Sequence, residues 1–475
     1  MKNRDSMANI THIAVFTLPA FTHQASIIEF CKRLLHLHQH IQVTFIFPTI
    51  GAPIPATLTL LDSLPSTTNH IYLPPANEED LPQNITLAMQ VHHAVSQSMP
   101  HFRDTLESLC ATTQLAALVV DPFANEALEI AKDFNLLSYI YVTTSTMTLS
   151  LLLHLPTLHE EVSGEYRDHM AIQIPGFVPI PGHHLPDDFQ DRSSLSYELI
   201  LQRSKRFSLA SGFLVNSFNE LEEDILRALQ EYSRGRYNNA PVYLVGPIIQ
   251  NGPSSVLNVS PCLGWLENQR PNSVLYVSFG SSCSLPQEQL NELALGLELS
   301  GQKFLWVLKP PCDSTNPTYI EARNDDPLKF LPNGFLERTK GQGLVIPSWA
   351  PQTQILTHTS TGGFVTHCGW NSTLESIAAG VPMITWPLCA EQRMNADLLT
   401  VGLKVGLRPK FMENHGIVEK EELAKVVKDL MLGNEGIGNG IRQRIKKLKD
   451  AAADAIKEHG SSARALSHFG TQLES

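Results

Sequence analysis

The sequence has no pair of closely spaced cysteines. Seven Cys occur among 475 residues, an odd number, and none belongs to a C-x-x-C pair. Even, closely spaced sets of Cys are typical of disulfide frameworks in secreted proteins and of zinc ribbons. We therefore expect reduced thiols and a cytoplasmic location. The seven Cys are at positions 31, 110, 262, 283, 312, 368 and 389.

The sequence also lacks a long hydrophobic run. A helix needs about 20 consecutive apolar residues to cross a bilayer, and no segment reaches that length. The apolar run at 13–21 follows Lys2 and Arg4 and so resembles a secretion signal, but it is short and contains a Pro. Without a small-residue cleavage pattern after it, the run predicts a first buried strand. We expect no membrane span.

Charged residues are scarce. They make up 17% of the chain, against 43% hydrophobic residues, and the formal net charge is -12. This modest negative charge argues against nucleic acid or an anionic membrane as the main partner, although a local anion site stays open. Single hydrophobic cores stop growing near about 250 to 300 residues, so a chain of this length predicts two domains.

Short runs rich in Val, Ile and Phe alternate with longer helical patterns, and this series occurs twice. Strands that are apolar throughout and separated by helices are typical of parallel sheets covered on both faces. We therefore predict two doubly wound, Rossmann-like α/β domains. The predicted strands are 12–18, 43–49, 116–122, 139–144 and 212–218, then 274–281, 304–309, 343–349, 362–369 and 382–388.

A stretch rich in Gly, Pro, Ser and Asn, at 246–261, separates the two series. Its composition and weak periodicity are typical of a linker. Ligands of open α/β sheets bind outside the carboxyl ends of the strands, so we expect a site in a cleft between the domains. The predicted units are an N-terminal domain at 1–248, a linker at 249–262, a C-terminal domain at 263–455, and a helix at 456–475 that packs back on the N-terminal domain.

The hexapeptide HCGWNS, at 367–372, follows a predicted strand and opens a helix that Gly380 and Pro382 end. One interpretation is purely structural. Ser372 and Glu375 have the spacing of a capping box, in which each side chain satisfies a free backbone N–H at the start of the helix.

Two further interpretations involve a ligand. Zinc is poorly supported, because His367 and Cys368 are adjacent and neither has a partner at ligand spacing. A phosphate suits a helix N-terminus, where free N–H groups and the positive end of the helix dipole face an anion. Gly369 would let the backbone approach, and His367 and Asn371 would add donors. The hexapeptide alone leaves the cap and the phosphate site equally open.

The longer context favours the phosphate site. The stretch 349–392, WAPQTQILTHTSTGGFVTHCGWNSTLESIAAGVPMITWPLCAEQ, closely resembles the signature box of plant family-one UDP-dependent glycosyltransferases. It matches at the opening Trp-Ala-Pro-Gln, at HCGWNS, at the Glu three residues beyond Ser372, and at the closing Glu-Gln. The stretches 61–66, 273–281 and 330–352 look most like the subgroup that glucosylates small phenols such as hydroquinone and monolignols.

This resemblance implies a GT-B fold and a set of donor-binding residues. Trp349 would stack on the uracil of UDP-glucose, and the backbone of Ala350 would read its edge. The side-chain oxygens of Gln and Glu suit the hydroxyl groups of a sugar. In the family, a Gln at the last position of the signature box accompanies glucose as the donor sugar. The remaining donor residues would be Gln352 and Glu375 at the ribose, Ser281, His367, Gly369, Asn371 and Ser372 at the diphosphate, and Ser145, Trp370, Glu391 and Gln392 near the sugar.

The resemblance also implies a catalytic base. His23 occupies the place of the family's catalytic His, and Asp121, which closes a later strand, would orient it. A neutral imidazole can take the acceptor proton near pH 7, and a carboxylate on its other nitrogen fixes the tautomer. The acceptor oxygen would then displace UDP with inversion. No Asp-x-Asp occurs in the sequence, so we expect neither a metal nor another cofactor.

The chain departs from the family at two places. The family's Gly-x-Gly before the catalytic His reads Ala20, Phe21 and Thr22, and its Pro-Thr-Thr reads Thr143, Thr144 and Ser145. Three functions therefore stay open: O-glucosylation of a small phenol or flavonoid, N- or C-glucosylation of an aromatic acceptor, and binding of a UDP-sugar with little turnover. We expect a monomer whose partners are UDP-glucose and a small aromatic molecule.

Overall fold

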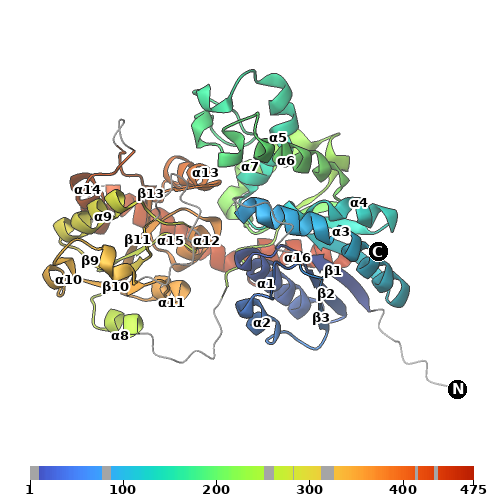
Figure 1. The fold of residues 1–475 in the computed structure, drawn as a ribbon, viewed down its shortest axis with the longest axis horizontal. Coiled ribbons are helices and arrows are strands. Elements are labelled where there is room, and N and C mark those ends of the chain that lie inside the picture. Colours follow the sequence, from blue (N-terminus) through green and yellow to red (C-terminus); the bar gives the residue numbers. More distant parts are fainter. Residues whose placement is uncertain are drawn as a thin grey trace.

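A computed structural model describes residues 10–76, 87–250, 261–281, 283–311, 326–411, 416–432 and 437–474. These residues form two parallel β-sheets with their helices, and the two halves lie side by side (Figure 1). The prediction of two doubly wound α/β domains is confirmed. The predicted boundaries at 248 and 263 stay predictions, because residues 251–260 of the linker lie outside the described residues.

The N-terminal half contains a sheet of seven strands in the order β3-β2-β1-β4-β5-β6-β7. Its strands are β1 Thr11–Phe16, β2 Ile41–Phe47, β3 Thr68–Tyr72, β4 Leu115–Val120, β5 Leu137–Val142, β6 Gly212–Val215 and β7 Val242–Leu244. Its helices are α1 Phe21–Leu37, α2 Pro55–Leu61, α3 Leu87–Thr112, α4 Ala127–Asp133, α5 Thr146–Glu161, α6 Leu195–Arg206 and α7 Asn219–Ser233.

The C-terminal half contains a sheet of six strands in the order β10-β9-β8-β11-β12-β13. Its strands are β8 Val274–Ser278, β9 Lys303–Leu308, β10 Gly343–Pro347, β11 Thr361–Thr366, β12 Met383–Thr385 and β13 Gly406–Leu407. Its helices are α8 Pro261–Glu267, α9 Gln287–Ser300, α10 Phe335–Arg338, α11 Gln352–Thr357, α12 Trp370–Ala379, α13 Gln392–Asp397, α14 Lys420–Met431, α15 Ile437–Ala455 and α16 Ser461–Gln472.

The central strands are buried on both faces. In β1, Ala14 and Phe16 belong to one hydrophobic cluster, whereas Ile13 and Val15 belong to another on the opposite face. Successive side chains of a strand point to opposite faces, so a strand that is apolar throughout needs a cover on each side. The helices provide that cover, which explains why these strands lack the alternation of a half-exposed sheet.

All ten predicted strands are present, and the three strands that the sequence did not reveal are edge strands. β3 has the sequence TNHIY and is only partly buried, while β7 and β13 have three and two residues. An edge strand has a neighbour on one side only, and these three are short or polar. They therefore carry no long apolar run.

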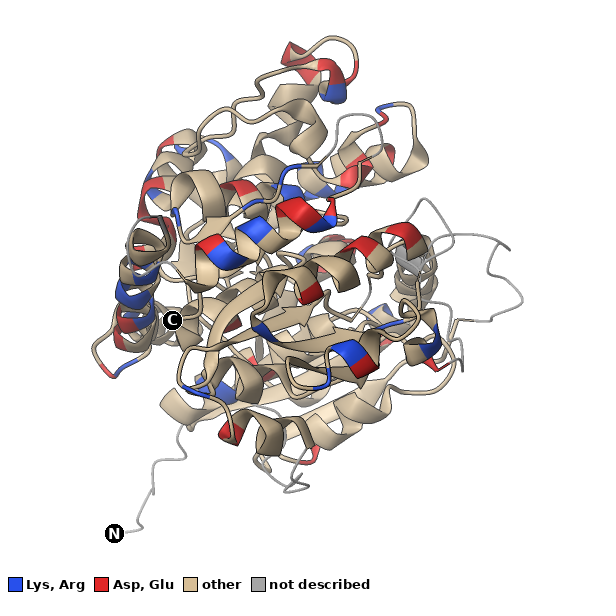
Figure 2. Ribbon diagram, turned by 90° about the vertical axis from the view of Figure 1, so that its left-hand side faces the viewer, with Lys and Arg blue, Asp and Glu red and all other residues tan. Residues whose placement is uncertain are grey.

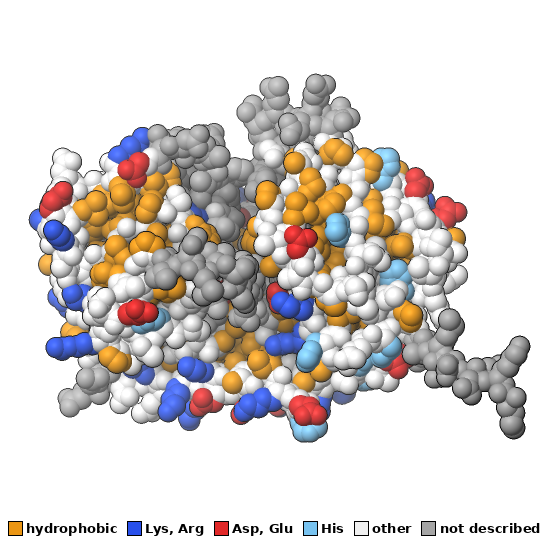
Figure 3. Space-filling model, turned by 90° about the horizontal axis from the view of Figure 1, so that it is seen from below, with side chains coloured by type: hydrophobic (Ala, Val, Ile, Leu, Met, Phe, Trp, Pro, Cys, Tyr) orange, Lys and Arg blue, Asp and Glu red, His pale blue; other side chains and the backbone are white. Residues whose placement is uncertain are grey.

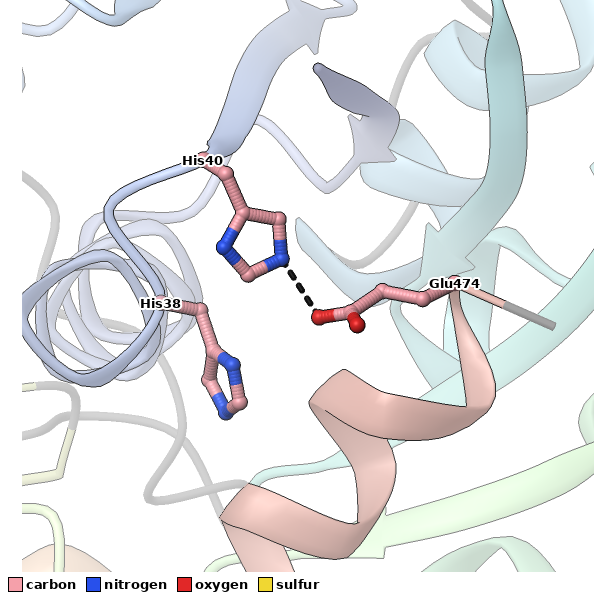
Figure 4. Close-up of side chains that lie close together, drawn as sticks. All are labelled: His38, His40 and Glu474. Carbon is pink, nitrogen blue, oxygen red and sulfur yellow. Dashed lines mark ion pairs between the residues drawn. The ribbon is translucent and has the colours of Figure 1, made fainter. Parts of the chain in front are cut away.

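The last helix packs on the N-terminal half. α16 contacts α1 and β7, and its Phe469 is fully buried with ring contacts to Phe30 and Tyr139 at 6.2 and 4.9 Å. Just beyond the helix, Glu474 Oε1 lies 2.5 Å from Nε2 of His40 (Figure 4). Figure 1 shows α16 beside α1, while α15 lies nearer α12.

The surface carries charges of both signs. On the face in Figure 2, acidic and basic residues are interspersed along the helices. Seen from below, apolar side chains form patches interrupted by polar ones (Figure 3). A protein that binds nucleic acid typically has one contiguous basic face, and neither view shows such a face. Within the described residues, no helix combines the length and hydrophobicity needed to cross a bilayer.

Candidate active site

The strand order reverses once in each sheet, and the predicted site residues lie at both reversals. β1 and β4 are neighbours in the first sheet, as β8 and β11 are in the second. The connections that follow two such strands run to opposite faces of the sheet, which opens a crevice at the carboxyl ends of the strands. His23 and Asp121 follow β1 and β4, whereas Ser281 and His367 follow β8 and β11.

His23 and Asp121 form a close pair. Nδ1 of His23 lies 2.6 Å from Oδ2 of Asp121, across 98 residues of sequence. The other carboxylate oxygen accepts the backbone N–H of Phe123 at 2.9 Å, and Asp121 is fully buried. The carboxylate is therefore fixed at both oxygens. Among the described residues, Nε2 of His23 has no hydrogen-bond partner, and the His23 side chain is 23% exposed.

The pKa of His23 is raised. Burial opposes protonation of the ring, but the charge of Asp121, its hydrogen bond and the charge of Glu391 together outweigh burial and raise the pKa above its usual value. Glu391 belongs to the C-terminal half, so the imidazole of one half senses a carboxylate of the other.

The backbone before His23 needs no glycine. Ala20 is the N-cap of α1, with φ of -137° and ψ of 119°, and Thr22 lies in the first turn of that helix. Neither residue is among those with positive φ. Both residues have negative φ, so their side chains are accommodated without backbone strain.

The second reversal encloses His367 between two glycines. A Cβ atom on Gly280 or on Gly369 would lie 2.4 Å from Nε2 of His367. Both positions therefore require glycine for the ring to fit. Burial and the nearby Lys309 ammonium lower the pKa of His367 to about 4. The ring is neutral at pH 7 and can donate a hydrogen bond from one nitrogen only.

Of the interpretations left open for the hexapeptide, the capping box at Ser372 and Glu375 is wrong. α12 begins at Trp370 and its N-cap is Gly369, which has no side chain to cap it. A turn at Cys368, where φ is 67°, precedes this helix. The helix therefore begins three residues earlier than a cap at Ser372 would require. The expected helix end is confirmed, because Gly380 adopts a left-handed conformation with φ of 76°.

Ser372 and Glu375 instead share a partner from α11. Nε2 of Gln352 donates to Oγ of Ser372 and to Oε2 of Glu375, each at 2.8 Å. Burial, opposed by the Gln352 hydrogen bond, raises the pKa of Glu375 to about 7. The structure thus brings together two residues predicted for the ribose and one predicted for the diphosphate. Oδ1 of Asn371, the neighbour of Ser372, is buried without a hydrogen-bond partner in the described chain.

Trp349 is exposed at the carboxyl end of β10. Its relative exposure is 76%, and among the large apolar side chains of the described residues only that of Met170 is more exposed. Ala350 beside it is 6% exposed. A Trp that belonged to the core would be buried, so its exposure favours a contact with a ligand over packing. Ser348 before it has φ of 70°.

The start of α13 carries two residues predicted to contact the sugar. Glu391 is the N-cap of α13, and Gln392 is 6% exposed. Oε1 of Gln392 accepts the backbone N–H groups of Leu388 and Cys389 at 2.9 and 3.0 Å, so its carboxamide holds the turn that precedes the helix. A contact of Gln392 with the sugar stays a prediction that would rely on its Nε2.

Two predicted residues have structural partners. Trp370 is 3% exposed, and its Nε1 donates to the backbone oxygen of Asn216 in the N-terminal half at 2.7 Å. Its indole therefore joins the halves, and a contact of Trp370 with the sugar stays a prediction that would rely on its backbone. Ser145 is fully buried and caps α5 by accepting the N–H of Thr148 at 3.1 Å.

Strained backbone positions gather in this region. Ser348, Cys368 and Ala390 have φ of 70°, 67° and 52°, and follow β10, β11 and β12 in turn. A left-handed conformation is costly for residues other than Gly and Asn, and such positions cluster at functional sites. The three turns that carry the predicted donor residues are therefore held by the fold against local preference.

Sequence reasoning missed Lys309 and Asp187. Nζ of Lys309, at the carboxyl end of β9, donates to the backbone oxygen of Gly280 beside His367. Burial lowers the pKa of Lys309 to about 8, so it remains a cation at pH 7. The Lys that directly follows the buried run 304–308 was the available signal. Asp187 lies far from any motif, yet its carboxylate accepts the N–H of Ala390 at 2.9 Å.

Other candidate sites lie elsewhere. Among the described residues, one group has the spacing of metal ligands, namely His38, His40 and Glu474. It lies at the opposite end of α1 from His23. A hollow of about 630 Å³ between α7, β7 and α16 contains none of the predicted site residues.

Sequence comparison relates the chain to enzymes that use UDP-sugars. A profile described as UDP-glucoronosyl and UDP-glucosyl transferase matches residues 66–434. A hydroquinone glucosyltransferase from Rauvolfia serpentina is 48% identical over 472 residues, which covers 98% of this chain and 99% of that protein. UDP-glycosyltransferase 72B1 of Arabidopsis thaliana is 46% identical over 461 residues, which covers 96% of this chain and 95% of that protein.

Solved structures are similar over nearly the whole chain. Phytolacca americana UGT2 with UDP-2-fluoro-glucose and pterostilbene has a TM-score of 0.87 at 42% identity, covering 98% of this chain and 100% of its own. A UDP-glucosyltransferase from Polygonum tinctorium, capable of glucosylating indoxyl and complexed with 3,4-dichloroaniline, has a TM-score of 0.90 at 42% identity. It covers 99% of this chain and 100% of its own.

Proposed function

Because the chain belongs to the plant family-one UDP-glycosyltransferases and is a UDP-glucose-dependent enzyme with a GT-B fold, we propose that it transfers glucose with inversion to the hydroxyl of a small phenolic or flavonoid acceptor. The observation that carries this proposal is the His23–Asp121 pair at one strand reversal, opposite the Gly-enclosed His367 at the other.

His23 acts as the general base. Its Nδ1 is held by Asp121, so its Nε2 is left to accept the proton of the acceptor hydroxyl. Asp121 fixes the tautomer and stabilises the imidazolium that forms during transfer. The activated oxygen forms a bond to the anomeric carbon on the face opposite UDP, and the bond from that carbon to the UDP oxygen breaks, which inverts the configuration.

The donor lies along the carboxyl ends of the second sheet. The exposed indole of Trp349 supports stacking on uracil, and the Gln352–Glu375 pair supports hydrogen bonds to the ribose. The backbone at Ala350 reads the uracil edge. The diphosphate meets Ser281, His367, Gly369, Asn371 and Ser372, and the glucose meets Glu391, Gln392 and the backbone of Trp370. Ser145 is fully buried and contributes to this region only by capping α5.

The leaving group is stabilised without a metal in this mechanism. Free N–H groups at the start of α12 and its positive dipole face the β-phosphate as negative charge develops on it. Lys309, beside Gly280 and His367, adds a full positive charge at the same place. The anion in turn favours the protonated form of Lys309, so binding the donor counteracts the effect of burial on its pKa.

The proposed acceptor class rests on the relatives. The hydroquinone glucosyltransferase is named for a small phenol, and the Phytolacca americana structure contains the phenol pterostilbene. Transfer to nitrogen is a second candidate, because the Polygonum tinctorium relative was solved with 3,4-dichloroaniline. Ala20 and Thr22, both unstrained beside a formed His23–Asp121 pair, argue against the third possibility of a binder without turnover.

A product assay tests the proposal. The protein is incubated with UDP-glucose and matched pairs of acceptors, such as hydroquinone with its dimethyl ether and 3,4-dichlorophenol with 3,4-dichloroaniline, and products are identified by mass and acid hydrolysis. We expect acid-labile O-glucosides of the phenols and none from the ether. Products from the aniline alone would support N-transfer, acid-stable products C-transfer, and no product beside tight UDP binding a binding protein.

A further inference from the structure

Two cysteines meet in the segments that carry the donor residues. Sγ of Cys283 lies 2.8 Å from Sγ of Cys389, although 106 residues separate them, and both are free thiols. Cys283 is in the segment between β8 and α9, two residues beyond Ser281. Cys389 is in the turn before α13, two residues before Glu391. The pair therefore connects the predicted diphosphate and sugar contacts.

The surroundings of the pair give the two thiols different chemistry. Nε2 of Gln392 lies 3.3 Å from the sulfur of Cys389 and 3.8 Å from that of Cys283. A hydrogen bond with Cys389 lowers the pKa of Cys283; burial opposes it, and Gln392 and the Lys309 ammonium assist it. The same hydrogen bond and burial raise the pKa of Cys389. Cys283 is thus the thiol of the pair that ionises more readily.

We propose that Cys283 and Cys389 are a site of reversible oxidation, in which a hydroperoxide converts the two thiols to a disulfide that weakens binding of the sugar donor. The thiolate of Cys283 attacks the peroxide and becomes a sulfenic acid, releasing one water from hydrogen peroxide. The thiol of Cys389 then attacks that sulfur and releases the second water. Two thiols and one hydrogen peroxide give one disulfide and two waters.

The disulfide acts on the donor site through geometry. A disulfide bond is about 2.05 Å long, so the sulfurs approach by about 0.8 Å from their present separation. The segments of Ser281 and Glu391 become tied together, and Gln392, whose Nε2 contacts both sulfurs, shifts with them. This consequence rests on the proposed donor site, whereas formation of the disulfide does not.

Peptide mapping without reduction tests the chemistry. After treatment with hydrogen peroxide, we expect a linked Cys283–Cys389 peptide that dithiothreitol removes, and slower linkage when UDP is bound. Cys110→Ser, which alters a partly buried thiol on α3, is the matched control and should form the same peptide. Absence of the linked peptide, or its appearance with another cysteine, would overturn the site.

Binding then tests the consequence. We expect oxidation to weaken UDP-glucose binding at least fivefold in the wild-type protein, reversibly, and not in Cys283→Ser or Cys389→Ser. Equal weakening in the two serine variants would overturn the proposal. A titration with UDP-glucose needs no acceptor, so failure to glucosylate phenols would contradict the proposed function without touching this result.

A second cluster, independent of the donor site, has the composition of a metal site. One ring nitrogen each from His38 and His40 and one carboxylate oxygen of Glu474 lie within 4.8 Å of one another (Figure 4). Nε2 of His40 lies 2.5 Å from Oε1 of Glu474, yet within the described chain neither this nitrogen nor Nε2 of His38 makes a hydrogen bond of acceptable geometry. Buried polar atoms are normally satisfied, so these two need an explanation.

The fold holds the three groups together. His38 is the C-cap of α1, His40 directly precedes β2, and Glu474 follows α16. A Cβ on Gly470 would lie 2.3 Å from Nε2 of His38, so a glycine in α16 lets the ring approach. Two imidazoles and one carboxylate are a ligand set of Zn²⁺, which binds at about 2.0 to 2.2 Å and takes water in a fourth position. The geometry points to a Zn²⁺ site that clips the end of α16 to the first strands.

Titration with Zn²⁺ tests this second site. We expect one ion per chain, a raised melting temperature, and binding at least tenfold weaker in His38→Ala and Glu474→Gln. His36→Ala is the matched control, since His36 lies on the same helix outside the cluster, and it should bind like wild type. Equal Zn²⁺ binding by wild type and the two cluster variants, or none by wild type, would overturn the site.

Discussion

His23 depends on a partner that reaches it from 98 residues away. Replacing His23 with Ala removes the base but none of the proposed UDP contacts, so we expect transfer to fall by about 10² to 10⁴ while UDP affinity stays near wild type. Steady-state kinetics and a UDP titration measure the two effects separately.

His36→Ala is the control for this change, because His36 is an exposed residue near the other end of α1. It should leave both quantities unchanged. A parallel loss of UDP affinity in His23→Ala would show that His23 holds the donor and not the acceptor.

The pH dependence of transfer follows from the raised pKa of His23. The ring must be neutral to accept a proton, so the acid limb of kcat/KM should lie above pH 6.5 and rise toward higher pH. Asp121→Asn removes a negative charge that raises this pKa, leaving burial, which lowers it, opposed by the charge of Glu391. We expect the acid limb of kcat/KM to move to lower pH and the plateau value of kcat/KM to fall.

The pH profiles of wild type and Asp121→Asn on one phenol, with initial rates at low acceptor concentration, decide this prediction. A limb that stays in place in the variant, or moves to higher pH, would mean that another group titrates.

At the scale of elements, α12 carries the buried carboxylate of Glu375 at some cost in stability. The folded pKa of Glu375 is about 7, above its usual 4.5. The folded state therefore binds more protons between these values, and the stability that this group contributes is present below about pH 4.5 and lost as the pH rises to about 7. Glu375→Gln has no such loss.

We expect Glu375→Gln to match the wild type at pH 4.5 and to exceed it at pH 8, by at most about 3 kcal/mol for a shift of this size. UDP affinity should fall in the same variant, because the proposed ribose contact loses its charge. Melting temperatures at the two pH values check the first statement. A stability difference that does not depend on pH would refute the linkage.

The start of α1 should control access of the acceptor. Ala20 and Thr22 have negative φ, so replacing both with Gly relieves no strain and changes helix stability by less than about 1 kcal/mol. We expect the double variant to accelerate turnover of a bulky phenol more than that of hydroquinone. A large rise in melting temperature with unchanged acceptor preference would contradict this role.

At the scale of the whole molecule, the two halves are joined close to the proposed site. Asp187 accepts the N–H of Ala390 and pairs with Arg393 at 2.7 Å, while His184 lies 2.6 Å from Asp397. These contacts run from the segment after α5 to the turn that carries Glu391. The N-terminal half therefore positions part of the proposed donor site.

We expect Asp187→Asn to raise KM for UDP-glucose roughly fivefold with kcat little changed, because an exposed pair is worth at most about 1 kcal/mol. Glu298→Gln breaks a comparable exposed pair, with Arg338, inside the C-terminal half and should leave KM unchanged. The same rise in both variants would mean that a general loss of stability is being measured.

The sequence by itself determined the two parallel sheets, ten of the thirteen strands that the described residues form, and the family. Buried parallel strands produce continuous apolar runs in the sequence, whereas the helices between them produce apolar residues at helical spacing. Both patterns can be recognised within a short stretch of sequence. The match at 349–392 then identified His23 and Asp121 as a pair, and the structure brings them within 2.6 Å.

Only the tertiary structure decided how these residues are used. In the structure, α12 begins at Trp370 and not at a cap formed by Ser372, and the Trp370 indole donates to the backbone of Asn216. Oε1 of Gln392 accepts backbone N–H groups of the turn before α13. The tertiary structure also brought Cys283 to Cys389 across 106 residues. The physical reason is range: backbone preference and periodicity act over a few residues, whereas these contacts form between elements whose positions depend on the packing of the whole chain.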